Sequence, residues 1–244
     1  MTTQKEKIKA FVSFTSSTQA LATRMLKEFH WNLDQAVDAY FSRAPKPVNN
    51  SKIEKIFDEY CENDKNVILV NGTERLCADL NVDPNNVLML VLSWHLESES
   101  MCEFSRAGWI KGWSKFGVQS LQQMRDTIPE LKKDLSDPAI FKQIYVWTFG
   151  WAKSLDSQQK SLPLETAIAF WELILEKDKY IHLDLWIEFL VNEYKKSINK
   201  DVWSLLLDFM NTIGHDFSGY DEDGAWPTVF DSFVEYARNK LSLL

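Results

Sequence analysis

The sequence predicts an all-α fold. Only eight glycines and seven prolines interrupt 244 residues, while ten tryptophans and fifteen phenylalanines supply large apolar side chains. Apolar residues recur at the spacing of one helix face along most of the chain, and no strand-like alternation extends beyond residues 66–70. With 45% hydrophobic residues, the chain can bury a substantial core.

Residues 4–43 predict a small module of three short helices. The first ends near Phe14, a polar break follows at residues 15–18, and a second helix runs through residues 20–29. Asn32 is placed to cap the third helix, with Gln35 as its capping-box partner. Residues 44–50 contain two prolines and two asparagines, which predicts a linker.

A larger helical domain is expected over residues 51–244. Proline at the first helical position is expected at Pro84, Pro138 and Pro163, and Ser105 and Ser120 are suited to N-cap positions. The apolar periodicity then predicts helices near residues 52–61, 72–81, 84–96, 105–116, 120–134, 138–154, 163–177, 183–196, 200–213 and 227–241.

Charge and cysteine usage narrow the class of protein. The net charge of −8 argues against general binding of nucleic acid or of an anionic membrane. No apolar run reaches the roughly 20 residues of a membrane span. The N-terminal residues are charged and have no apolar core of signal-peptide length. Three widely spaced cysteines predict reduced intracellular thiols. We therefore expect a protein of the cytoplasm and nucleus.

The segment from Glu62 to Thr73 has the length of a calcium-binding EF-hand loop. Glu62, Asp64 and Asn66 occupy ligand positions, but Val67 stands where the turn needs glycine and Thr73 where a bidentate glutamate is needed. The sequence therefore favours EF-hand-like helical pairs that lack metal, and a calcium sensor remains an alternative. No cofactor is implied.

Catalytic motifs do not stand out in this sequence. The histidines, His30, His95, His182 and His215, form no ligand pair at helical spacing. Phosphate-binding loops, nucleophile elbows and zinc-protease motifs do not occur. We therefore expect a protein without a catalytic role.

One segment is strongly acidic. Residues 201–237 hold eight Asp or Glu side chains and no Lys or Arg. Asp231 and Glu235 are like charges at i, i+4, a spacing that destabilises a helix. A folded element that keeps so much like charge predicts a docking surface for a basic partner.

Several separated motifs of the larger domain resemble the potentiating-neddylation domain of the defective-in-cullin-neddylation family. They run in order from about residue 52 to 241. They are Cys102-Glu103-Phe104-Ser105, Phe149-x-Trp151-Ala152-Lys153, Ala167-Ile168-Ala169-Phe170-Trp171, Leu183-Asp184-Leu185-Trp186, Ser197-Ile198-x-Lys200-Asp201-x-Trp203-x-Leu205-Leu206-Leu207-Asp208-Phe209 and Tyr220-Asp221-Glu222-x-Gly224-Ala225-Trp226-Pro227.

Residues 4–43 resemble the ubiquitin-associated (UBA) module that precedes this domain in some family members. Ala20-Leu21 and residues 31–41 carry the likeness. The Met-Gly-Phe loop that many such modules use is replaced by Phe14-Thr15-Ser16. The resemblance implies ubiquitin as a partner of the module, with Phe14 and Phe41 as its contact residues.

The resemblance implies a non-catalytic accessory subunit of a cullin neddylation ligase. Such a subunit brings the charged neddylation conjugating enzyme to the cullin C-terminal winged-helix domain, beside the cullin-associated RING protein, and promotes modifier transfer to a cullin lysine. A ubiquitin-binding adaptor acting mainly through the UBA-like module is the alternative.

The same resemblance assigns two sites. The cullin-binding surface carries over to Asp201, Ala225 and Asp231. An apolar pocket for the acetylated N-terminus of the conjugating enzyme carries over to the following residues: Val70, Met89, Leu90, Cys102, Phe104, Trp151, Phe170 and Leu173. From the residues alone, such soft and aromatic side chains most often form core, and a groove that accepts an apolar peptide end is the alternative.

Overall fold

The computed structural model describes residues 3–15, 19–43, 50–62, 66–153 and 160–241. The regular structure among these residues is almost entirely helical, and the four strands have two residues each. The all-α prediction is therefore confirmed. None of the helices in these ranges is both long and apolar enough to span a bilayer.

The first three helices form a module with its own small core. They are α1 (Gln4–Thr15), α2 (Gln19–Glu28) and α3 (Leu33–Arg43). Phe11 is fully buried among them and meets Tyr40 edge to face, with ring centroids 5.6 Å apart. The predicted cap on α3 is confirmed, because the Gln35 N–H donates to Asn32 Oδ1 at 3.1 Å. The expected linker lies outside the described residues except for its last position, Asn50, which begins the next helix.

The next part of the chain forms a pair of helix–loop–helix units. Its strands pair antiparallel, with Ile68 opposite Phe104, and this pairing joins the two loops. The elements are α4 (Asn50–Tyr60), β1 (Val67–Ile68), α5 (Val70–Leu80), α6 (Val87–His95), β2 (Phe104–Ser105) and α7 (Arg106–Lys115).

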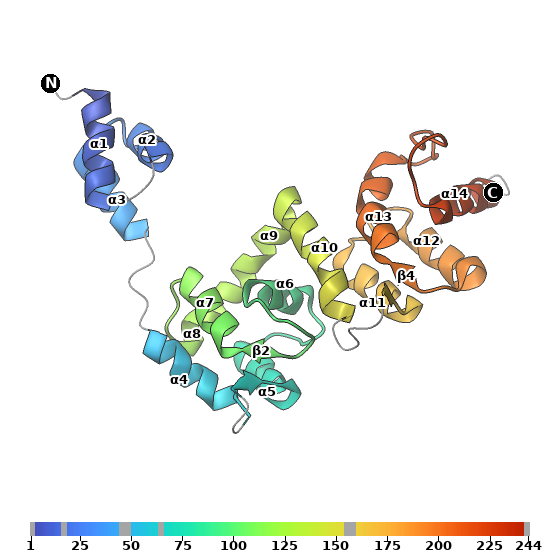
Figure 1. Cartoon of the computed structure of the whole chain (residues 1–244), viewed down its shortest axis with the longest axis horizontal. Coiled ribbons are helices and arrows are strands. Elements are labelled where there is room, and N and C mark those ends of the chain that lie inside the picture. Colours follow the sequence, from blue (N-terminus) through green and yellow to red (C-terminus); the bar gives the residue numbers. More distant parts are fainter. Residues whose placement is uncertain (1–2, 16–18, 44–49, 63–65, 154–159, 242–244) are drawn as a thin grey trace.

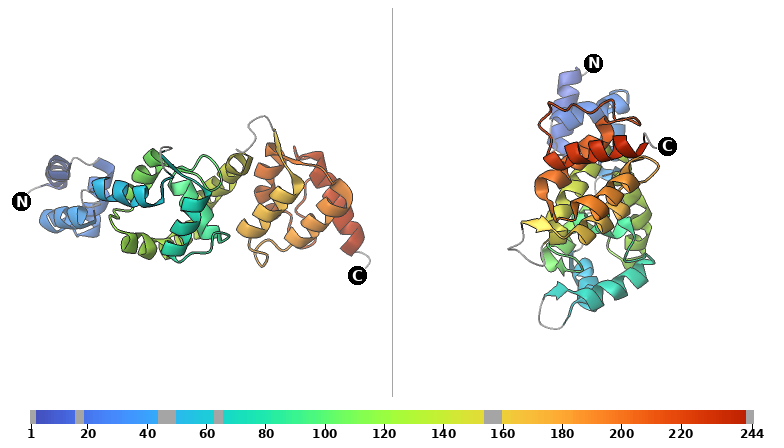
Figure 2. Two further views of the ribbon diagram at one scale, coloured as in Figure 1. Left: turned by 90° about the horizontal axis from the view of Figure 1, so that it is seen from below. Right: turned by 90° about the vertical axis from the view of Figure 1, so that its right-hand side faces the viewer.

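A second pair of units repeats this plan. Here Leu162 lies opposite Ile198, again antiparallel. The elements are α10 (Pro138–Lys153), β3 (Ser161–Leu162), α11 (Leu164–Ile174), α12 (Leu183–Phe189), β4 (Ile198–Asn199) and α13 (Lys200–Thr212), with α14 (Thr228–Leu241) packed against α12. Figure 1 shows α10 running from the first pair into the second, and Figure 2 confirms that the two pairs adjoin through this helix.

Two predicted helices are interrupted in the structure. The segment 120–134 was expected as one helix, but it divides into α8 (Leu121–Thr127), a 3₁₀ turn (Ile128–Leu131) and α9 (Lys132–Ser136). Pro129 is the physical reason, since it cannot donate to the α-helical ladder. The segment 183–196 ends its α-helix at Phe189, continues as a π-helical turn over Leu190–Tyr194 and closes at Lys195, whose φ is +53°.

The helix start signals are mostly confirmed. Ser105 accepts from the Gly108 N–H and Ser120 from the Gln123 N–H, each as an N-cap. Pro138 begins α10 as expected. Pro84 instead precedes α6, which is capped by Asn86, and Pro163 is itself the N-cap of α11.

Stacked aromatic rings hold α10, α11 and α13 together. The Trp203 ring lies between those of Tyr145 and Trp171, at centroid distances of 5.0 and 5.2 Å and 13° from parallel with each. The Tyr145 hydroxyl donates to the Trp203 carbonyl at 2.7 Å and accepts from Trp171 Nε1 at 3.0 Å. Burial raises the pKa of Tyr145, so the hydroxyl keeps its proton and can donate.

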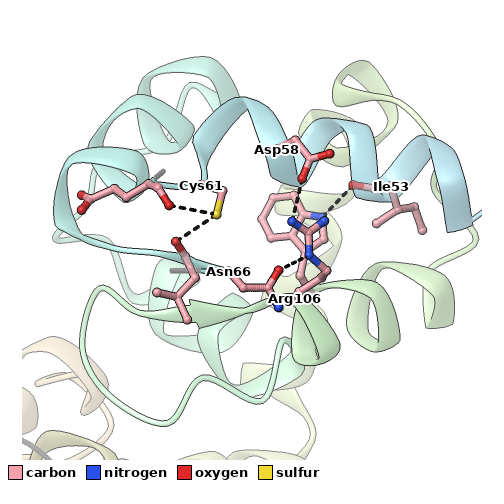
Figure 3. A network of polar contacts seen from close by, with 8 residues as sticks. Ile53, Asp58, Cys61, Asn66 and Arg106 are labelled. Atoms are coloured by element: carbon pink, nitrogen blue, oxygen red, sulfur yellow. Dashed lines mark hydrogen bonds and ion pairs between the residues drawn. The ribbon is translucent and has the colours of Figure 1, made fainter. Parts of the chain in front are cut away.

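The EF-hand-like loop of the first pair is tied together by a guanidinium group. Arg106 donates from Nη2 to Asp58 Oδ1 at 2.6 Å and from Nε to Asn66 Oδ1 (Figure 3). Its guanidinium carbon also lies 4.4 Å from the centroid of the Phe57 ring. The Asn66 oxygen that a calcium ion would require is therefore already bound. Asp64 lies outside the described residues, among which no cluster of three or more possible metal ligands occurs.

Candidate functional site

A cavity of about 380 Å³ opens between the two helical pairs. The first pair supplies side chains from α5, α6 and β2 and from the loops before and after α6, and the second supplies them from α10 and α11. The lining residues are Thr73, Cys77, Pro84, Asn85, Asn86, Met89, Leu90, Ser93, Met101, Cys102, Phe104, Trp151, Ala169, Phe170 and Leu173.

The loop before β2 gives the cavity its shape. Cys102 adopts a left-handed backbone, with φ at +57°, and its carbonyl accepts from the Thr73 hydroxyl at 3.3 Å. The Ser98 hydroxyl lies 2.8 Å from the Glu103 carbonyl and accepts from Trp151 Nε1 at 2.9 Å. These contacts bind the loop to α5 on one side and to α10 on the other.

Seven of the eight residues assigned to the pocket line this cavity. Val70 does not, because it points to solvent from the first turn of α5 and is 53% exposed. The sequence missed Thr73 and Cys77 on α5, and Ser93 on α6. Helical spacing could have found Ser93, which is one turn beyond Met89, and Ala169, which precedes Phe170 and is one turn before Leu173.

The cavity is uncharged. None of the residues that line it carries a formal charge at neutral pH. Burial raises the pKa of the Cys77 thiol to about 11, and burial followed by the nearby Glu74 raises the pKa of the Cys102 thiol. Both thiols therefore stay protonated at neutral pH, and the cavity suits a neutral, largely apolar group.

The three residues assigned to the cullin surface lie on α13, on α14 and in the turn between them. Asp201, Ala225 and Asp231 are all exposed. Tyr220 donates its hydroxyl to Asp231 Oδ1, and its ring and that of Trp226 both pack edge-on against Phe209. This cluster brings Ala225 and Asp231 to one end of α13, whereas Asp201 lies roughly 12 Å further along the helix axis.

The chain itself neutralises part of the acidic segment, and compensation of the remaining charge by a basic partner stays a prediction. Lys142 on α10 pairs with Asp208 at 2.8 Å, and Arg238 on α14 pairs with Glu222 at 2.6 Å. Within the described part of the chain, Asp201 and Glu235 have no ion pair or hydrogen bond from a side chain.

The two residues of the module assigned to ubiquitin contact are Phe14 and Phe41. Phe14 is 66% exposed near the end of α1. The side chain of Phe41 lies outside the described residues.

Comparison with known proteins agrees with this arrangement of a small module followed by a docking domain. A UBA-like domain matches residues 5–46, and a cullin-binding domain matches residues 123–236. The class of protein is thus a helical docking protein with a UBA-like module.

Related proteins define the family. The chain is 31% identical to "Defective in cullin neddylation protein 1" of Caenorhabditis elegans over 98% of its own length and 91% of that protein. It is 33% identical to the protein of the same name in Yarrowia lipolytica, over 96% of each. It is 36% identical to "DCN1-like protein 3" of Xenopus laevis, over 78% of this chain but only 63% of that relative. The chain belongs to the defective-in-cullin-neddylation family.

Proposed function

We propose that the chain is a non-catalytic accessory subunit of a cullin neddylation ligase. Family membership and the matched cullin-binding domain support a role in cullin neddylation. The finer mechanism is that the chain holds the cullin C-terminal domain and the conjugating enzyme at once, beside the cullin-associated RING protein. Holding both raises their effective concentration and limits unproductive orientations during modifier transfer.

The observation that carries the proposal is that an exposed acidic surface and an uncharged cavity lie on one helical domain with a continuous core. The exposed acidic side chains on α13 and α14 suit basic side chains of a cullin. The uncharged cavity between the helical pairs suits an acetylated N-terminus, because acetylation removes a charge that would be costly to bury.

Two variants of the full chain test this proposal, and each is the control for the other. Asp231→Lys reverses an exposed charge, and we expect at least about tenfold weaker binding of a cullin C-terminal domain by calorimetry, with binding of an acetylated conjugating-enzyme peptide unchanged. Ala169→Phe fills the cavity from an exposed helical position, and we expect the reverse pattern. Loss of both activities in either variant, or of neither, would contradict two separate sites.

A second candidate function is a ubiquitin-binding adaptor acting through the module. It is favoured by the UBA-like match and by Phe14, an apolar side chain that is largely exposed. In this case Phe14→Asp would abolish ubiquitin binding, measured by chemical-shift titration, while cullin binding stays unchanged. Equal ubiquitin shifts with the native chain and the variant would rule out Phe14 as the contact.

A further inference from the structure

The irregular loop between α13 and α14, residues 213–227, carries a hydroxyl group in a strongly acidic sequence context (Figure 1). Ser218 lies in this loop. Carboxylates follow it at the third, fourth and fifth positions, on Asp221, Glu222 and Asp223. No other serine or threonine of the sequence has carboxylates at all three of these positions. Protein kinases select their substrates partly by charge pattern, so this sequence suits a kinase whose substrate-binding site is basic.

The structure presents the Ser218 side chain to solvent. Ser218 and Gly219 are exposed, and the buried rings of Phe217 and Tyr220 anchor the loop on either side of them. The Ser218 hydroxyl donates to Asp216 Oδ1 at 2.7 Å. Because Asp216 is itself exposed, water can replace this hydrogen bond at little cost. The hydroxyl is therefore accessible in the folded chain.

Two other hydroxyls of the acidic segment also have a carboxylate three residues further on, but their backbone differs. Thr228 precedes Asp231 and Ser232 precedes Glu235 at this spacing. Both hydroxyls lie within α14, where Ser232 donates to the Thr228 carbonyl at 3.2 Å. An irregular loop adapts to the cleft of an enzyme at lower cost than a helix, whose hydrogen bonds must first open. Ser218 is therefore the favoured acceptor, and the two helical hydroxyls are its matched controls.

We infer that Ser218 is a phosphorylation site for a protein kinase that prefers acidic substrates. In the transfer, Ser218 Oγ attacks the γ-phosphorus of ATP, and the bond between that phosphorus and the β–γ bridging oxygen breaks. The catalytic aspartate of the kinase accepts the hydroxyl proton, and ADP leaves. The product is a phosphoserine with a charge of about −1.5 to −2 at neutral pH. The charge of the acidic segment then depends on kinase activity.

Arg238 on α14 is placed to pair with this phosphate. Its Nη2 donates to the carbonyl of Phe217, the residue before Ser218, at 3.5 Å, and its Nη1 donates to Glu222 at 2.6 Å. A phosphate carries more charge than a carboxylate and forms strong, often bidentate hydrogen bonds with a guanidinium group. The phosphoserine therefore competes with Glu222 for Arg238, and a released Glu222 adds a further carboxylate to the surface.

Phosphorylation of the full chain in vitro tests the site. The chain is incubated with ATP and an acidophilic kinase of the casein kinase type, and mass spectrometry locates the phosphate. We expect modification at Ser218, its loss in Ser218→Ala, and unchanged uptake in the controls Thr228→Ala and Ser232→Ala. The double variant Asp221→Asn, Asp223→Asn should slow uptake roughly tenfold, because it removes two of the charges that the kinase recognises.

Phosphorus NMR of the modified chain tests the pairing with Arg238. The second pKa of a phosphoserine lies near 6, and a neighbouring cation lowers it. Arg238→Gln should therefore raise this pKa by at least about 0.5, whereas Lys240→Gln, which removes an equally exposed cation of α14 that pairs with Glu188, should leave it unchanged.

The native chain decides the site, since the position of the phosphate is read from it directly. No uptake by the folded native chain, uptake at Thr228 or Ser232 instead, or equal uptake by native chain and Ser218→Ala would overturn the assignment of Ser218. An identical phosphate pKa in the native chain and Arg238→Gln would overturn the pairing. Neither measurement uses a cullin or a conjugating enzyme, so these outcomes leave the proposed function untouched.

Discussion

At the scale of the residue, a few buried polar atoms fix the geometry of the larger domain. Tyr145 is fully buried, and its hydroxyl serves both a carbonyl on α13 and an indole N–H on α11. The resemblance placed Trp171 and Trp203 within conserved-looking motifs, but nothing in the sequence named Tyr145 as the residue that joins them. Contacts between residues 58 positions apart depend on the tertiary fold and leave no local pattern.

We expect Tyr145→Phe to lower the free energy of unfolding by about 1–3 kcal/mol, because it leaves Trp171 Nε1 without its acceptor inside the core. Urea unfolding followed by circular dichroism measures the change. Tyr236→Phe is the control, since that hydroxyl bonds Glu188 in a partly exposed position and its loss should cost under about 1 kcal/mol. Equal losses in both variants would argue against a special role for Tyr145.

At the scale of the element, the sequence predicted the helices well and their interruptions poorly. Long apolar stripes such as that of α13 mark a helix because the same side chains face the core at every turn. Pro129 could have been recognised as a break. The two-residue strands could not, since each pairs with a partner more than 35 residues away and has no alternation of its own.

The apolar cavity, likewise, could be predicted only in part. Its large side chains were assigned through family resemblance, and most of them line the cavity. From composition alone, core was the favoured interpretation of Met89, Phe104 and Phe170. Val70 does not line the cavity, because the first turn of α5 points it toward solvent. A sequence motif does not show which way a helix is rotated about its axis.

Two helical glycines differ in how closely other atoms approach them, so their substitutions form a matched pair. A Cβ on Gly108 of α7 would lie 2.1 Å from the Leu96 carbonyl oxygen, at the end of α6, whereas a Cβ on Gly150 of α10 would meet nothing within 4 Å. We expect Gly108→Ala to destabilise the domain by at least about 1–3 kcal/mol through overpacking. Gly150→Ala should stabilise it by about 0.5–1 kcal/mol, because alanine favours a helix interior. Thermal or urea unfolding of both variants measures these changes in the free energy of unfolding. A mild effect at Gly108 would mean that α6 and α7 can move apart.

At the scale of the whole molecule, the buried apolar residues of the described ranges form two separate clusters. One lies within α1–α3 around Phe11, and the other extends from Ile53 to Ala237 through both helical pairs. The division into residues 4–43, 44–50 and 51–244 was predicted from composition and stays a prediction, because independence of folding is a matter for experiment.

Deleting residues 1–49 tests this division. We expect the unfolding midpoint of the remaining chain to equal that of the larger transition in the full protein, and cullin binding to persist. The reason is that, among the residues described, the core of the larger domain shares no buried side chain with the module. Differential scanning calorimetry of both proteins gives the midpoints. A clear drop in the midpoint of the shortened chain would show that the module stabilises the domain.

The apolar cavity has walls from both helical pairs, and this has a thermodynamic consequence. A ligand that contacts α5 and α6 on one side and α10 and α11 on the other can bind only while the two pairs keep their relative positions. Binding then raises the free energy of unfolding. The increase grows with the logarithm of ligand concentration once the site is saturated. Under the proposed function, the melting temperature of the chain would therefore report how much of its docking partner is present.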